Sequence, residues 1–227
     1  LKAACSQYAA KYGGEDGSHI TVREFSINDS HESLLFHILN EAPEILAFSC
    51  YIWNISAVRK LCADIRKAAP ETVIVLGGPE VSFGMEHTGI SPSNYDYVLE
   101  GEGEKSFYCL MSQLQDPDFT EPEEKFALWP SIYHKETLPQ FQNRIVYYES
   151  SRGCPYRCAY CLSGACGTVR YLPMERVYSY EPMPASLTPE EQKYIKGVQA
   201  NLWTEYIATF PHAQYMVLPR WAALCEI

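Results

Sequence analysis

Residues 45–52, Ile-Leu-Ala-Phe-Ser-Cys-Tyr-Ile, and residues 72–79, Thr-Val-Ile-Val-Leu-Gly-Gly-Pro, decide the fold class of this chain. The first stretch and the core of the second are continuously apolar, as strands are when a parallel sheet is buried on both faces. The segment between them, residues 55–68, is predicted to form a helix. A strand, a helix and a second strand in this order predict a βαβ unit and therefore a parallel sheet.

The same alternation continues on both sides of this unit. The additional predicted strands are residues 20–25 and 97–99, and the additional predicted helices are residues 1–12, 30–39 and 105–114. Gly13 and Gly14 follow the first helix, as glycine often does at a helix end, and Asp29 or Ser30 is placed to cap the second. The rhythm predicts an α/β fold with a Rossmann-like, doubly wound parallel sheet over residues 1–115.

Polar or glycine-rich segments follow three of the predicted strands. In doubly wound sheets, ligands bind at the carboxyl ends of the strands, and glycine lets a ligand approach the backbone closely. The residues predicted to bind a cofactor there are Ser49, Cys50, Tyr51, Gly77, Gly78, Gly101 and Gly103. Glycines after strands are also common turn residues, so the pattern alone leaves a purely structural role open.

A cysteine-rich loop follows the apolar, strand-like segment 145–148. Its sequence, Gly153-Cys-Pro-Tyr-Arg-Cys-Ala-Tyr-Cys161, spaces three cysteines as CxxxCxxC. Three thiolates in one short loop suit a [4Fe–4S] cluster that keeps one iron open to a small molecule, so Cys154, Cys158 and Cys161 are predicted metal ligands. The alternative is a zinc knuckle that uses Cys166 as a fourth ligand.

Composition narrows the class of protein. The formal net charge of −10 argues against a nucleic-acid partner, because phosphate binding needs clustered lysine and arginine. No apolar stretch approaches the ~20 residues that cross a bilayer. Nine cysteines, six of them scattered, fit the reduced cytoplasm better than a disulfide framework. A start at Leu1 rather than at methionine leads us to expect a truncated N-terminus.

The cysteine loop, with the aromatic Tyr160 before its third cysteine, resembles the cluster loop of radical S-adenosylmethionine (SAM) enzymes. The resemblance implies that the open iron binds SAM, with Tyr160 among the cofactor-binding residues. One electron, from a donor such as flavodoxin or ferredoxin, would then release a 5′-deoxyadenosyl radical. The hard chemistry in such enzymes belongs to the cofactors, which the protein binds and orients.

The stretch from residue 1 to 114, followed by that loop, resembles the cobalamin-binding half of cobalamin-dependent radical SAM proteins. The resemblance implies that Ser49-Cys50-Tyr51 lies beside the nucleotide tail of the corrinoid, and that Gly77-Gly78 is the double glycine of the family. The first strand of the family and the loop that contacts the lower face of cobalt would precede Leu1. We therefore expect an open sheet edge where that strand belongs.

Residues 178–227 are similar to the C-terminal end of the catalytic barrel of retaining β-N-acetylhexosaminidases. The segments that carry the similarity are 187–191, 197–206 and 215–224. The similarity implies that Trp203 and Glu205 contact a sugar, although a buried core position is the commoner fate of a tryptophan. The adjacent Asp-Glu catalytic pair of that family has no counterpart here, so no catalytic residue is predicted.

The predicted organisation has four parts: a cobalamin-binding-like domain (1–115), a proline-rich acidic linker (116–142), the start of a radical SAM barrel (143–177) and a hexosaminidase-like fragment (178–227). The last two would be incomplete (β/α) barrel segments. The leading hypothesis is a cobalamin-dependent radical SAM enzyme with a [4Fe–4S] cluster and an incomplete catalytic apparatus. The alternatives are a carbohydrate-binding fragment and an inert chimeric fragment. Substrate and oligomeric state are not assigned.

Overall fold

The computed structural model describes residues 1–122, 151–154, 169–171, 189–192, 209 and 211. The chain divides into two compact units, residues 1–132 and 133–227. Each unit is described by itself below.

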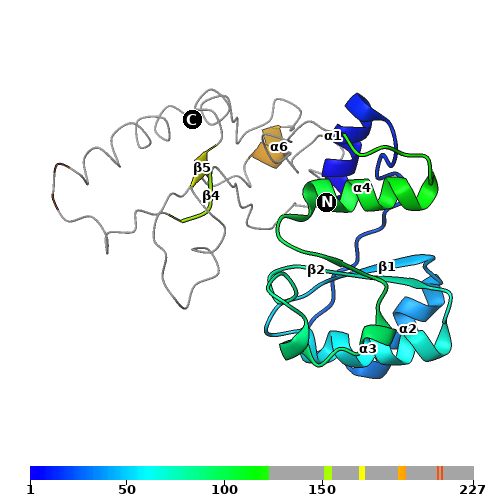
Figure 1. Ribbon diagram of the computed structural model, residues 1–227. Coiled ribbons are helices and arrows are strands. Elements are labelled where there is room, and N and C mark those ends of the chain that lie inside the picture. The colour runs from blue at the N-terminus through cyan, green and yellow to red at the C-terminus, as the bar shows by residue number, and fades with distance from the viewer. Residues whose placement is uncertain (123–150, 155–168, 172–188, 193–208, 210, 212–227) are drawn as a thin grey trace. The chain divides into compact units, whose positions relative to one another are not determined.

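A three-stranded parallel sheet forms the centre of the first unit (Figure 1). Its strands are β1 (Ile45–Ser49), β2 (Val73–Gly77) and β3 (Tyr97–Leu99), in the order β1-β2-β3. Ile45 lies opposite Val73, and Val75 lies opposite Tyr97. The parallel sheet predicted from the apolar runs is confirmed.

Two pairs of helices cover the two faces of this sheet (Figure 1). The first pair is α1 (Lys2–Tyr12) and α4 (Gly103–Gln115), and the second is α2 (His31–Glu41) and α3 (Ile55–Ala68). Two short 3₁₀ helices, η1 (Glu86–Thr88) and η2 (Pro92–Asn94), lie between β2 and β3. All four predicted helices are present, and the predicted cap of α2 is Ser30, whose hydroxyl accepts a hydrogen bond from the Ser33 amide at 3.2 Å.

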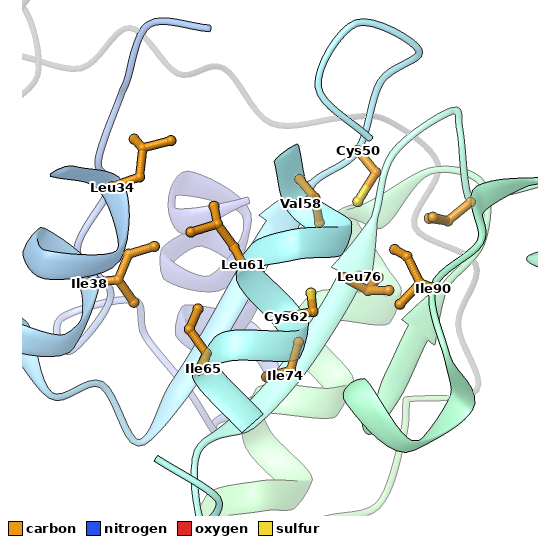
Figure 2. Packing of buried hydrophobic residues seen from close by; sticks show 11 residues of the cluster. Leu34, Ile38, Cys50, Val58, Leu61, Cys62, Ile65, Ile74, Leu76 and Ile90 are labelled. Carbon is orange, nitrogen blue, oxygen red and sulfur yellow. The ribbon is translucent and has the colours of Figure 1, made fainter. Parts of the chain in front are cut away.

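The core on the α2–α3 side of the sheet is shown in Figure 2. Helix α3 contributes residues at helical spacing; in Figure 2 Leu61 and Ile65 lie on the side of α3 that faces Leu34 and Ile38 of α2. Fully burying a side chain of this kind stabilises the fold by roughly 1.5–3 kcal/mol. The buried members of the cluster are Leu34, Ile38, Cys50, Val58, Leu61, Cys62, Ile65, Ile74, Leu76, Val81 and Ile90.

A second core lies on the α1–α4 side. It includes Tyr8 and Tyr108, whose rings meet edge to face with centroids 5.5 Å apart, and Val75, which alternates to this face of β2. Because β2 has buried residues on both faces, its run of apolar residues is explained by its central position.

The predicted strand over residues 20–25 is wrong. The segment forms no strand, residues 21–30 are all exposed, and Val22 is 64% exposed. Strand propensity is realised through pairing and packing with neighbours, and within the described residues no strand pairs with this segment.

The first apolar run also differs from the prediction at its end. The strand stops at Ser49 rather than at residue 52, because the Tyr51 amide donates to the Asn54 side chain at 2.8 Å and a turn follows. In the described part of the chain β1 pairs only with β2, and Ala47 and Ser49 are exposed. Among the described residues, β1 is therefore an edge strand of the sheet.

The described residues of the second unit are few. Strands β4 (Ser151–Arg152) and β5 (Arg170–Tyr171) are antiparallel, with Ser151 opposite Tyr171. Helix α6 (Pro189–Gln192) begins at a proline, which is favoured at the first helical position. The strand-like segment 145–148 and the hexosaminidase-like segment 197–206 lie outside the described residues.

None of the helices within the described ranges is both long enough and apolar enough to cross a membrane.

Candidate functional site

The three strands of the first unit end at one edge of the sheet. Because the strands are parallel, the ends of β1 at Ser49, of β2 at Gly77 and of β3 at Leu99 lie side by side. We call the loops that follow them, residues 50–54, 78–84 and 100–103, together with these strand ends, the carboxyl edge. This arrangement brings together all seven predicted cofactor-binding residues of the first unit.

Loop 50–54 is closed by the side chain of Asn54. Its Oδ1 accepts from the Tyr51 amide at 2.8 Å, and its Nδ2 donates to the Ser49 carbonyl at 2.8 Å. The rings of Tyr51 and Trp53 stack with centroids 4.6 Å apart and planes 9° from parallel. The loop is therefore held by two side-chain hydrogen bonds and one aromatic stack.

The double glycine Gly77-Gly78 stands at the end of β2, and the structure explains why its second residue is glycine. Gly78 has φ of +103°, and a Cβ built on it would lie 2.7 Å from the Cys50 carbonyl oxygen. The Cys50 backbone is already engaged, because its amide donates to the Gly77 carbonyl at 2.7 Å and its carbonyl accepts from the Glu80 amide at 3.2 Å. The glycine allows these two loops to lie in contact.

Ser82 connects the loops after β2 and β3. Its hydroxyl donates to the Gly78 carbonyl at 2.8 Å and accepts from the Gly101 amide at 3.0 Å. Gly101 has φ of +72°, and a Cβ built on it would meet no atom within 4 Å. Backbone next to open space at the carboxyl edge is where a ligand can approach closely.

Cys50 contributes to this edge through its backbone and packing. Its side chain is fully buried and points into the core shown in Figure 2. Burial raises the pKa of its thiol to about 11, and the thiol lies 3.8 Å from the Phe48 carbonyl oxygen. The side chain is therefore a protonated core residue at neutral pH, whereas Ser49 beside it is exposed.

Two aromatic residues at this edge were not singled out in the sequence. Trp53 is 63% exposed and Phe83 is 52% exposed, each in a loop that directly follows a strand end. Their position in the sequence could have identified them, because a large apolar residue in a loop after a strand has few neighbours to bury it and can mark a binding surface. Within the described residues, no group of three or more His, Cys, Asp or Glu side chains could hold a metal ion.

The base of the cysteine loop is described in the second unit. Cys154 is a half-buried free cysteine two residues after β4, and Gly153 before it has φ of +94°. The β4–β5 pair joins the two ends of the segment 153–169, so the loop is closed at its base. Tyr160, Cys158 and Cys161, and the predicted sugar contacts Trp203 and Glu205, lie outside the described residues.

Two family models match separate parts of this chain. Residues 6–110 match the family model "B12 binding domain", and residues 142–227 match "Glycosyl hydrolase family 20, catalytic domain". The parallel sheet with helices on both faces is consistent with the first of these. The resemblance of the N-terminal half to a cobalamin-binding domain and that of the C-terminal segment to a hexosaminidase are confirmed.

Individual relatives fall into the same two groups. The chain is 28% identical over 171 residues to the cobalamin-dependent radical SAM methyltransferase TokK of Streptomyces tokunonensis, covering 60% of this chain and 24% of that protein. It is 29% identical over 153 residues to a 2-(S-pantetheinyl)-carbapenam-3-carboxylate methyltransferase of Streptantibioticus cattleyicolor, covering 52% and 22%. It is 42% identical over 57 residues to a β-hexosaminidase of Porphyromonas gingivalis, covering 25% and 7%. The chain thus spans less than a quarter of the length of each of these relatives.

The glycosyl hydrolase match begins at residue 142 and so includes the cysteine loop. The sequence predicts the start of a radical SAM barrel over residues 143–177 and a change of family at residue 178. That boundary stays a prediction.

Proposed function

We propose that the first unit binds a corrinoid across its carboxyl edge, and that the chain is part of a cobalamin-dependent radical SAM enzyme. The observation that carries the proposal is the match of residues 6–110 to the B12 binding domain. That range includes the whole carboxyl edge, in which hydrogen bonds join three strand-end loops. Ligands of open α/β sheets bind at this edge.

The carboxyl edge offers polar groups that a ligand can contact. Ser49 presents an exposed hydroxyl next to the loop closed by Asn54, and Gly101 presents backbone next to open space. A described cavity of about 290 Å³ lies instead between the ends of α2 and α3 and the start of β2, lined by residues such as Ile38, Ile65 and Thr72. A corrinoid would therefore lie over the edge, with Ser49 and Gly101 contacting its periphery. When bound, the corrinoid supplies a cobalt centre that can carry a methyl group.

The reaction class proposed for the intact enzyme is methyl transfer. Two of the relatives are named as methyltransferases, and the alignment with TokK covers 60% of this chain, more than the B12-binding range alone. The substrate is left open. A reducing cytoplasm would keep the cluster-binding cysteines from forming disulfides, and a donor such as flavodoxin or ferredoxin would supply the electron to the cluster.

Retention of hydroxocobalamin tests the corrinoid proposal directly. The full chain is incubated with hydroxocobalamin, desalted and measured by visible absorption. We expect about one corrinoid per chain. A chain that leaves the column colourless, while its far-UV circular dichroism shows a folded protein, would contradict the proposal.

The second part of the proposal is that Cys154, Cys158 and Cys161 hold a [4Fe–4S] cluster whose open iron binds SAM, next to Tyr160. It is supported by the CxxxCxxC spacing and by the β4–β5 pair at the base of the loop. Three ligands leave one iron of the cluster free for a substrate molecule.

Anaerobic reconstitution with iron and sulfide tests the cluster. We expect about four irons per chain in the wild type, and none above background after the triple Cys→Ala substitution. Cys166→Ala is the matched control, because a four-ligand zinc knuckle would lose its metal in that variant. Equal iron in the wild type and the triple variant would remove the cluster from the proposal.

A second candidate function is sugar binding by Trp203 and Glu205. The match of residues 142–227 to glycosyl hydrolase family 20, and the 42% identity to a β-hexosaminidase, support it. A tryptophan ring can stack on the apolar face of an N-acetylhexosamine while a carboxylate accepts hydrogen bonds from its hydroxyls. Titration with N-acetylglucosamine, followed by tryptophan fluorescence, should give a change that Trp203→Ala abolishes and Trp129→Ala retains. No change in the wild type at millimolar sugar counts against this function.

A further inference from the structure

A cavity of about 290 Å³ lies at the end of the first unit opposite the carboxyl edge. Its lining residues come from the ends of α2 and α3 and from the short segments that lead into β1 and β2, which include Pro43 and Thr72. Because β1 and β2 are parallel and start opposite each other, these segments meet at the amino ends of the strands. The cavity is therefore separate from the corrinoid site proposed above.

The side chains that line the cavity are almost all apolar. Seven of its eight lining residues are aliphatic or proline, and the eighth, Thr72, donates its hydroxyl to the Pro43 carbonyl at 3.1 Å. Two of the larger ones, Ile38 and Ile65, lie on the facing sides of α2 and α3 (Figure 2). An apolar cavity of roughly 150 Å³ is large enough to bind benzene. This cavity therefore has room for a ring or a branched aliphatic group that carries a short polar arm.

Two helices end at this cavity. Helix α2 runs to Glu41 and α3 runs to Ala68, and the residues that follow them, Ala42 and Ala69, both line the cavity. The last four carbonyl groups of an α-helix have no partner within the helix, and they give its end a partial negative charge. Two such ends at one cavity favour a ligand that is positively charged and donates hydrogen bonds.

Acidic side chains near the cavity add to this negative charge. Glu41, Glu44 and Glu71 each stand next to a lining residue in the sequence. Arg23 pairs with Glu41 at 2.6 Å and offsets its charge. Glu44 and Glu71 are therefore the carboxylates that we expect to attract a cation to the cavity.

Two cations on the last turn of α3 are each engaged by a carboxylate. Arg66 pairs with Asp96 at 2.6 Å, and Lys67 pairs with Asp64 at 3.2 Å. Their charges are largely balanced by these partners, so they do not reverse the negative potential of the two helix ends.

We infer that this cavity binds a small primary ammonium ion with an apolar body of about six carbon atoms. The body lies against Ile38 and Ile65, and the ammonium group donates to carbonyl groups at the ends of α2 and α3. An ammonium group suits this position because it carries a full positive charge and three donors and has no acceptor. The inference goes beyond the corrinoid proposal and does not depend on it.

Titration of the full chain with benzylammonium, followed by amide chemical shifts, tests the inference. We expect a dissociation constant of about 1 mM, a value in keeping with so small a ligand. The Ala42 and Ala69 amides, which donate to the Leu39 and Ile65 carbonyls at 3.2 Å and 2.7 Å, should shift, and the Gly101 amide at the carboxyl edge should not. Benzyl alcohol and benzoate keep the ring and replace the cation, so each should bind at least about fivefold more weakly.

Charge substitutions supply the matched control. The double variant Glu44→Gln and Glu71→Gln should weaken benzylammonium binding about threefold and leave benzyl alcohol binding unchanged, because both side chains are exposed and only their charge is removed. Glu32→Gln should leave both unchanged, since Glu32 is an exposed carboxylate in the first turn of α2, at the opposite end of that helix. The inference is overturned if Ala42 and Ala69 do not shift, if benzyl alcohol or benzoate binds as well as benzylammonium, or if the double variant binds benzylammonium like the wild type.

Discussion

Ser82 and Gly101, on loops that follow different strands, are joined by a hydrogen bond of 3.0 Å from the Gly101 amide to the Ser82 hydroxyl oxygen. The same hydroxyl donates to the Gly78 carbonyl at 2.8 Å. One side chain therefore sets the spacing between the second and third loops of the carboxyl edge. Removing it tests whether that spacing matters for binding.

Ser82→Ala should lower the stability of the first unit by about 1 kcal/mol, because two hydrogen bonds are lost. The Gly101 amide should exchange with solvent faster, and hydroxocobalamin affinity should fall about threefold to tenfold. Ser93→Ala is the control, since the Ser93 hydroxyl bonds to the neighbouring side chains of Ser91 and Asn94 and not to another loop of the carboxyl edge. An unchanged Gly101 exchange rate in Ser82→Ala would show that this hydrogen bond does not hold the loop.

Gly78 and Gly101 form a matched pair for a test of steric constraint. Both have positive φ, but a Cβ at Gly78 would lie 2.7 Å from backbone oxygen, and a Cβ at Gly101 would meet nothing. Gly101→Ala should cost only the backbone strain of about 1–2 kcal/mol. Gly78→Ala should cost at least about 2 kcal/mol more, because two backbone segments must separate. Denaturation followed by far-UV circular dichroism ranks the two variants, and equal costs would argue against the close contact at Cys50.

The sequence predicted most of the first unit because its signals are local. The helix over residues 55–68 was predicted to the residue, and the cap of α2 came from one serine. The strand over 20–25 was predicted wrongly because alternation describes a side-chain pattern, whereas a strand also needs a partner for its backbone. Pairing partners are set by the whole fold and cannot be found in a six-residue window.

The candidate site likewise has features that the sequence could predict and features that it could not. Strand order follows from the βαβ rule, so the meeting of Ser49, Gly77 and Gly101 at one edge could be predicted. The roles of individual residues at this edge could not be predicted from the sequence. Cys50 turned out to be a core side chain and Gly78 a close backbone contact, and both depend on distances between loops far apart in sequence. Trp53 and Phe83 were missed for the opposite reason, since apolar residues are expected to be buried.

Amide exchange along β1 should alternate. The Val73 amide donates to the Glu44 carbonyl, and the Cys50 amide donates to the Gly77 carbonyl. Because backbone groups alternate in direction along a parallel strand, the amides of Leu46 and Phe48 face β2 and the amide of Ala47 faces away from it. We expect the Ala47 amide to exchange at least about 100-fold faster than the Phe48 amide. Equal protection of the two amides would show that another strand covers this edge.

Acid should weaken the contact between α3 and the sheet. Arg66 Nη2 lies 2.6 Å from Asp96 Oδ2, which also accepts from the Ile74 amide at 2.7 Å. Burial would raise the pKa of Asp96, but the Ile74 amide and the Arg66 guanidinium outweigh it and hold the pKa below its ordinary value of 3.8. A carboxyl whose folded-state pKa is lowered stabilises the fold above its unfolded pKa, and the stabilisation is lost as pH falls through the folded value.

Asp96→Asn should therefore remove part of this acid dependence. At pH 7 it should cost about 1 kcal/mol, a value reduced because the carboxyl is 37% exposed. Exchange of the β2 amides between pH 3 and pH 7 measures the effect. The control is Asp64→Asn, which removes a surface carboxylate that pairs with His31 and Lys67. A pH dependence unchanged by Asp96→Asn would show that other carboxyls control acid unfolding.

The described cysteines should differ sharply in reactivity. Burial raises the pKa of the Cys5 and Cys50 thiols to about 11 and that of Cys62 to about 12, and it also raises the pKa of Cys109. The thiolate is the form that reacts with iodoacetamide, so these four side chains carry almost none of the reactive species at pH 8, and burial blocks access as well.

Cys154 is half-buried and free. Peptide mapping of the metal-free chain should find alkylation at Cys154 at least about tenfold faster than at the other four. If a bound cluster then protects Cys154 while the buried four stay unreactive, the protection reports metal binding at the loop. Rapid alkylation of Cys50 in the folded chain would contradict its placement in the core.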